Sequence, residues 1–145
     1  YETYLVGKTE VIKDNNTLSS IKELNVGVMR GTWSHMLMQK YKIKHRTKFE
    51  TEELLIQGLA DGEIDAAFIS SPQYWWYVKN NPDTDLIYLN NFDFTRDVSL
   101  NVGILMRGAD ENTVQVFNNL LDKLLNNGKI KDIYASYGIK YVSPQ

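Results

Sequence analysis

Two short turns of the sequence contain side chains that could hold a small ligand. The first turn consists of Arg30, Gly31, Thr32, Trp33 and Ser34. Gly31 allows backbone to approach a ligand closely, and Thr32 can cap a helix whose unpaired N–H groups favour an anion. The expected gain is modest, about 0.3–1 kcal/mol for an exposed charge. Taken alone, these residues favour a simpler interpretation, a tight turn with a capping threonine.

The second turn begins with Ser70, Ser71 and Pro72 and leads into a strongly aromatic stretch from Tyr74 to Tyr77. The two serine hydroxyls can contact a ligand or cap a helix, and the sequence leaves both roles open. Four adjacent helical positions point all around a helix, so the aromatic side chains cannot all face one cleft. Tyr74 or Trp75 is a candidate for lining the site, whereas the group as a whole is expected to pack in the core or on the surface.

Catalytic chemistry finds little support in the sequence. The two histidines, His35 and His45, lack the spacing of a helical metal pair. Residues 27–32 lack the lysine of a phosphate-binding loop, and no nucleophile-elbow motif occurs. Glu52 and Glu53 are interpreted as charges that stabilise the start of a helix. We therefore expect a protein that is not an enzyme and that has no metal site and no cofactor.

Composition limits the class of protein further. The 145 residues are 43% hydrophobic and 23% charged, which is ordinary for one globular domain. The formal net charge of −2 produces no global field that favours nucleic acid or an anionic membrane, so no nucleic-acid partner is expected. No apolar run approaches the roughly 20 residues of a membrane-spanning helix. Because the sequence begins at Tyr1 rather than at a methionine, we expect a leader or a longer stretch of protein before it.

Strand and helix patterns alternate around the two turns. Strands are predicted at residues 24–28, 44–50, 64–69, 86–89 and 98–106, after an extended segment at 1–12. Helices are predicted over residues 33–41, 52–61, 72–80, 111–127 and 130–137, with Thr32, Thr51 and Asp110 as N-caps. This alternation predicts an α/β fold with a mostly parallel sheet and helices on both faces. Such sheets bind ligands beyond the carboxyl ends of their strands, where both turns are expected to meet.

Four segments, in this order and spacing, resemble a known family. They are residues 21–32 (IKELNVGVMRGT), 59–67 (LADGEIDAA), 103–108 (GILMRG) and 118–138, which ends in Tyr137 and Gly138. Together they resemble the second lobe and C-terminal part of a type II periplasmic solute-binding protein, of the bacterial extracellular solute-binding family 3. The resemblance covers nearly the whole chain.

The resemblance implies two lobes that close on a small polar solute between them. Residues 1–98 would form a hinge strand and the second lobe. Residues 99–145 would form a return hinge strand and C-terminal helices that pack on the first lobe, most of which lies outside this sequence. The implied location is periplasmic or extracytoplasmic, and the implied partners are the solute, the first lobe of the same protein, and a membrane permease or receptor module.

The resemblance leaves the biological role and the solute open. An ABC-type transporter is the first expectation. The alternatives are a ligand-sensing domain of a membrane signalling receptor and an accessory protein of a periplasmic quinoprotein dehydrogenase, a subgroup that the Ser71-Pro72 segment resembles. The amino-acid binders of the family commonly have an aspartate at the position of Ser70. A neutral hydroxyl cannot make that charge-assisted bond, which speaks against an α-amino acid as the solute.

Overall fold

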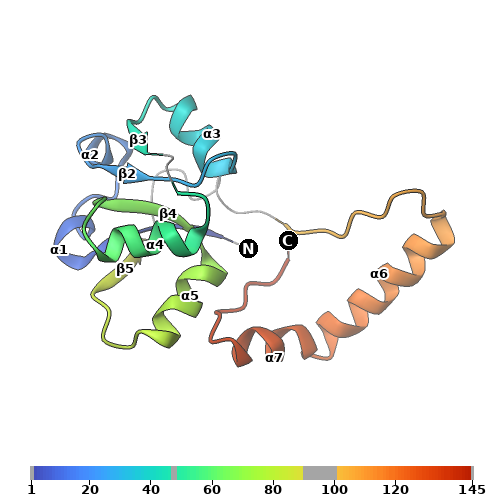
Figure 1. The fold of residues 1–145 in the computed structure, drawn as a ribbon. Coiled ribbons are helices and arrows are strands. Elements are labelled where there is room, and N and C mark those ends of the chain that lie inside the picture. The colour runs from blue at the N-terminus through green and yellow to red at the C-terminus, as the bar shows by residue number, and fades with distance from the viewer. Residues whose placement is uncertain (1, 47–48, 90–100, 145) are drawn as a thin grey trace.

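The computed structural model describes residues 2–46, 49–89 and 101–144 and contains one five-stranded sheet (Figure 1). The strands are β1 (Thr3–Lys8), β2 (Val26–Gly27), β3 (His45–Arg46), β4 (Ala66–Ser70) and β5 (Leu86–Leu89), in the spatial order β3-β2-β4-β1-β5. β2 pairs in parallel with both β3 and β4, and β1 pairs antiparallel with both β4 and β5. Only β1 therefore runs against the others, which confirms the prediction of a mostly parallel α/β sheet.

Helices cover both faces of this sheet, as predicted. The helices are α1 (Thr9–Ile12), α2 (Leu18–Ile21), α3 (Trp33–Lys40), α4 (Glu52–Ala60), α5 (Ser71–Asn80), α6 (Glu111–Asn126) and α7 (Lys129–Ser136). Leu5 of β1 and Phe68 of β4 pack with α1, α2 and α3 in one core, whereas Val6 and Ile69 pack with α4 and α5 in another. This division follows from the period of two along a strand, which sends neighbouring side chains to opposite faces.

Three helices begin at the N-caps expected from the sequence. The hydroxyl of Thr32 accepts a hydrogen bond from the backbone N–H of His35, and that of Thr51 accepts one from Leu54. The carboxylate of Asp110 accepts one from the N–H of Thr113. Each bond satisfies one of the N–H groups that the first turn of a helix leaves unpaired.

The prediction of a strand at residues 98–106 is wrong for the part of it that the structure describes. Residues 98–100 lie outside the described residues, and residues 101–106 form no strand. Leu105 is 97% exposed. A strand forms when a neighbouring strand supplies a ladder of backbone hydrogen bonds, and none of the five strands of the described sheet pairs with this segment. The extended segment predicted at residues 1–12 ends at Lys8, because α1 begins at Thr9. Of the strand predicted at residues 44–50, the described residues contain only the two-residue strand β3.

α6 stands away from the sheet and has no buried residue (Figure 1). Val114, Phe117 and Leu124, which recur at helical spacing and form an apolar stripe along α6, are 38%, 43% and 37% exposed. The chain returns toward the sheet through α7, where the Nζ of Lys79 donates to the carbonyl of Ser136 at 2.6 Å. The described part of the chain therefore leaves the stripe of α6 uncovered.

None of the helices in the described residues combines the length and the apolar character needed to cross a bilayer.

Candidate functional site

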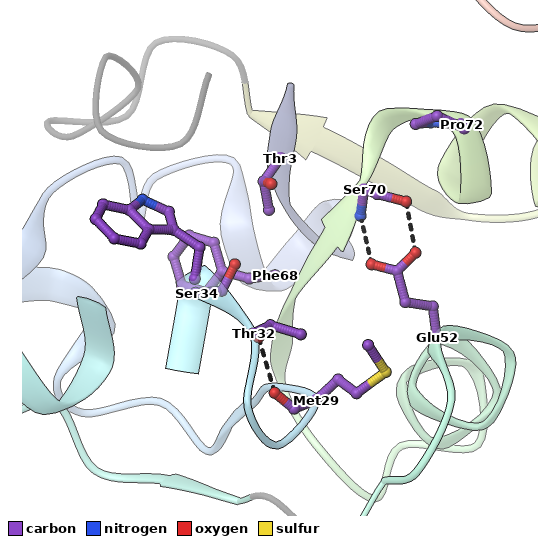
Figure 2. A pocket seen from close by; sticks show the side chains of 9 residues that line it. Thr3, Met29, Thr32, Ser34, Glu52, Phe68, Ser70 and Pro72 are labelled. Atoms are coloured by element: carbon purple, nitrogen blue, oxygen red, sulfur yellow. Dashed lines mark hydrogen bonds between the residues drawn. The ribbon is translucent and has the colours of Figure 1, made fainter. Parts of the chain in front are cut away.

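A pocket of about 290 Å³ lies at the edge of the sheet where β2 and β4 end (Figure 2). Several elements meet there: the start of β1, the turn between β2 and α3, the first residue of α4, the end of β4 and the first turn of α5. The lining residues are Thr3, Met29, Thr32, Trp33, Ser34, Glu52, Phe68, Ser70 and Pro72. This edge is the position that the topology of a parallel sheet predicts for a ligand.

The turn between β2 and α3 is held by hydrogen bonds to its own backbone. The hydroxyl of Thr32 donates to the carbonyl of Met29 at 2.8 Å (Figure 2). The same hydroxyl accepts from the backbone N–H of His35 at 3.3 Å. Gly31 has a φ of 79°, which glycine adopts without the steric cost that a side chain imposes. Its N–H donates to Nδ1 of His35 at 3.2 Å, so that nitrogen acts as an acceptor. The two interpretations of Thr32 are thus compatible, because this helix cap also lines the pocket.

Glu52 and Ser70 form a pair that joins α4 to β4. One carboxylate oxygen of Glu52 accepts from the backbone N–H of Ser70 at 2.9 Å, and the other accepts from the Ser70 hydroxyl (Figure 2). The Ser70 side chain makes no hydrogen bond as a helix cap, although Ser70 is the N-cap residue of α5. Both bonds have an ionised acceptor and are therefore stronger than bonds between neutral groups.

Four of the eight residues proposed from the sequence line this pocket, and four do not. Those that line it are Thr32, Trp33, Ser34 and Ser70. Arg30 and Gly31 lie on the exposed side of the turn, outside the lining.

Ser71 and Tyr74 stabilise the fold and lie outside the pocket lining. Ser71 is buried, and its hydroxyl and N–H both bond to the backbone of Glu2, which joins α5 to the segment before β1. Tyr74 is 5% exposed, donates to the carbonyl of Leu86 at 3.3 Å and packs edge-on against Tyr4 and Tyr88. Burial raises the pKa of the Tyr74 hydroxyl. These contacts assign both residues structural roles.

Five lining residues were not among the proposed site residues: Thr3, Met29, Glu52, Phe68 and Pro72. Glu52 is the most informative of them. It does lie in the first turn of α4, as interpreted from the sequence, but its carboxylate also reaches the pocket. A signal for this was available, because a helix between two parallel strands begins at the edge where those strands end.

Asp65 and the two histidines, which also lie near the sheet, have partners within the fold. The carboxylate of Asp65 accepts from the N–H of Asn25 at 2.7 Å, so this strand-end carboxylate is paired. The rings of His35 and His45 pack edge-on with centroids 5.2 Å apart. Within the described residues no cluster of three histidine, cysteine or acidic side chains could hold a metal ion.

Comparison with known proteins relates this arrangement to proteins that bind solutes. No family model matches the chain. A "Probable histidine-binding protein" of Neisseria gonorrhoeae is 30% identical over 142 residues, which are 96% of this chain and 51% of that protein. The chain therefore spans about half the length of this curated relative. In fold, the chain corresponds to part of a type II periplasmic solute-binding protein.

Solved structures of such binding proteins share the fold of this chain. The periplasmic binding protein XoxJ of Methylobacterium extorquens AM1 aligns with a TM-score of 0.74 and 18% identity, over 99% of this chain and 69% of its own. An amino acid ABC transporter substrate-binding protein of Streptococcus pneumoniae bound to L-arginine aligns with a TM-score of 0.70 and 16% identity, over 97% and 58%. Binding proteins predominate among the similar structures, but one is an ancestral cyclohexadienyl dehydratase, with a TM-score of 0.55 and 17% identity, over 94% and 56%. At these identities the structures establish the fold of this chain and nothing finer.

Proposed function

We propose that this chain is part of an extracytoplasmic solute-binding protein that delivers a small polar solute to an ABC-type membrane permease. The observation that supports this best is the pocket itself. Polar side chains from three elements, Thr32, Glu52 and Ser70, line one cavity at the ligand-binding edge of the sheet. The relative named as a histidine-binding protein and the structure with bound L-arginine add support, because both names describe capture of a small polar molecule.

Capture would depend on the first lobe, which would close over the pocket. We propose that residues 1–98 form the hinge strand and one lobe, and that residues 99–145 return to the first lobe and pack on it. The uncovered apolar stripe of α6 supports this division, because an amphipathic helix normally buries its apolar face against another element. The solute would favour the closed state through contacts that exist only when both lobes meet it.

Thermal shift on the complete two-lobed protein tests the proposal with a panel of small polar solutes that includes L-histidine and L-arginine. At ten times its Kd, a bound solute should stabilise the fold by about 1.4 kcal/mol. The double variant Thr32→Ala/Ser70→Ala should fold but lose this shift.

Thr51→Ala is the matched control for this variant. It removes a cap from α4 at a comparable cost of about 1 kcal/mol, but Thr51 lies outside the pocket lining. The control should therefore be less stable and still show the shift. Unchanged melting temperatures with every solute, and unchanged amide NMR signals of Thr32 and Ser70, would refute the proposed function.

A further inference from the structure

The pocket carries a negative charge from one carboxylate, that of Glu52. Of the nine residues that line it, Glu52 is the only one with an ionisable side chain, and the described lining includes no lysine, arginine or histidine. The remaining polar lining side chains are the hydroxyls of Thr3, Thr32, Ser34 and Ser70 and the indole of Trp33. A cavity with one carboxylate and no cationic side chain attracts positive charge and repels negative charge.

The carboxylate of Glu52 is held in place before any solute arrives. Both of its oxygens accept hydrogen bonds from Ser70, one from the backbone and one from the hydroxyl. A carboxylate has about four lone-pair positions, so two remain for a further donor. The side chain is only partly buried, and it faces the pocket rather than the core. Because Ser70 fixes its orientation, binding a cation costs less side-chain entropy than it would with a mobile glutamate.

We propose that Glu52 is the specificity-determining residue of this pocket and that it selects solutes with an ammonium, guanidinium or imidazolium group. Ser70 is a positioning residue that orients the carboxylate. The inference rests on the proposed function and deepens it by naming the charge class of the solute. It also answers the objection raised by the serine at position 70, because the negative charge reaches the pocket from α4 instead of from the end of β4.

Glu52 contributes a negative charge and forms hydrogen bonds to Ser70, and different substitutions separate these two contributions. Glu52→Gln removes the charge but keeps a side chain of the same length that can still bond to Ser70. Loss of a charge-assisted hydrogen bond should weaken binding of a cationic solute about 10- to 100-fold. Glu52→Asp keeps the charge and withdraws it by one methylene, so its effect should be intermediate. Ser70→Ala keeps the hydrogen bond from the backbone N–H of residue 70 to Glu52. It should therefore weaken binding of a cationic solute less than Glu52→Gln does.

The test uses the complete two-lobed protein, isotopically labelled, and NMR titration, with the amide signals of Thr32 and Ser70 as reporters. The probes are L-histidine, L-arginine and L-glutamine, compared with succinate and glucose, which have no cationic group. Glu53→Gln is the matched control, because it removes the same charge from the neighbouring position of α4, which is exposed and outside the pocket lining.

The expected result is that only probes with a cationic group bind, and that Glu52→Gln loses this binding at least tenfold while Glu53→Gln does not. Equal affinity in Glu52→Gln, or preferential binding of succinate or glucose, would overturn the inference and leave the proposed function standing. Absence of binding by every probe would count against both. If Glu52→Gln does not fold, the probes on the wild-type protein decide, and preferential binding of succinate or glucose overturns the inference.

Discussion

Replacement of Gly7 by alanine is expected to destabilise the sheet, because the structure leaves no room for a Cβ atom there. Gly7 lies in β1, opposite Ala66 of β4 on one side and Ile87 of β5 on the other. A Cβ atom at this position would lie 2.3 Å from Cγ2 of Ile12 and 2.8 Å from the backbone oxygen of Asp65. Favourable carbon contacts occur at about 3.5–4.0 Å, so both neighbours would have to move.

Two opposing effects set the size of the change. Alanine restricts the unfolded chain more than glycine does, which favours folding by about 0.4–1 kcal/mol. Insertion of a methyl group into a packed core costs about 1–3 kcal/mol. The upper part of that range applies here, because Ile12 is fully buried and the Asp65 oxygen belongs to the backbone. The net loss should be about 1–2 kcal/mol, or roughly 2–8 °C in melting temperature for a chain of this size.

Urea and thermal denaturation of Gly7→Ala measure this loss directly. Gly103→Ala is the control, because a Cβ atom there would meet nothing within 4 Å and its φ is not in the left-handed region. A double-mutant cycle with Ile12→Ala should show favourable coupling of about 1 kcal/mol or more, since the second substitution removes the clashing methyl group. A Gly7→Ala protein as stable as Gly103→Ala would refute the packing argument.

Two further predictions concern features outside the pocket. Burial raises the pKa of Tyr4 from 10.0 to about 12, so the folded form keeps a proton that the unfolded form loses above pH 10. Stability should therefore fall as the pH rises from 10 to 12, and urea melts at pH 9 and 11 should show a smaller fall in Tyr4→Phe. Phe117→Gln on the exposed face of α6 should change the stability of the chain by less than about 0.5 kcal/mol and reduce binding of an apolar dye. A large loss of stability would mean that this face is buried in the chain.

Local signals accounted for most of the helices and for the strands β2, β4 and β5. The caps Thr32, Thr51 and Asp110 each bond to an N–H three residues later, so a short stretch of sequence contains the whole interaction. The strand at Leu86–Leu89 was also located correctly. It is bounded by turn residues and needs no distant information to be recognised.

The features that were missed depend on contacts between distant residues. The bond between Glu52 and Ser70 joins residues 18 positions apart, and neither side chain alone indicates the other. Tyr74 was proposed to line the site because it follows the second turn, but its ring packs against Tyr4 from the beginning of the chain. The segment 101–106 has a strand-like composition, and the missing determinant is a neighbouring strand in the described residues.

The position of β1 in the sheet affects the rate at which the sheet can fold. This first strand lies between β4 and β5, and Leu5 pairs with both Phe68 and Leu89. The sheet thus depends on contacts between residues far apart in the chain, which slows folding because a long loop must close before the pairing is rewarded. During synthesis at about 5–20 residues per second, Leu5 would wait roughly 4–17 s for Leu89 to be made. Until Leu89 has been made, β1 therefore has no complete β5 with which to pair.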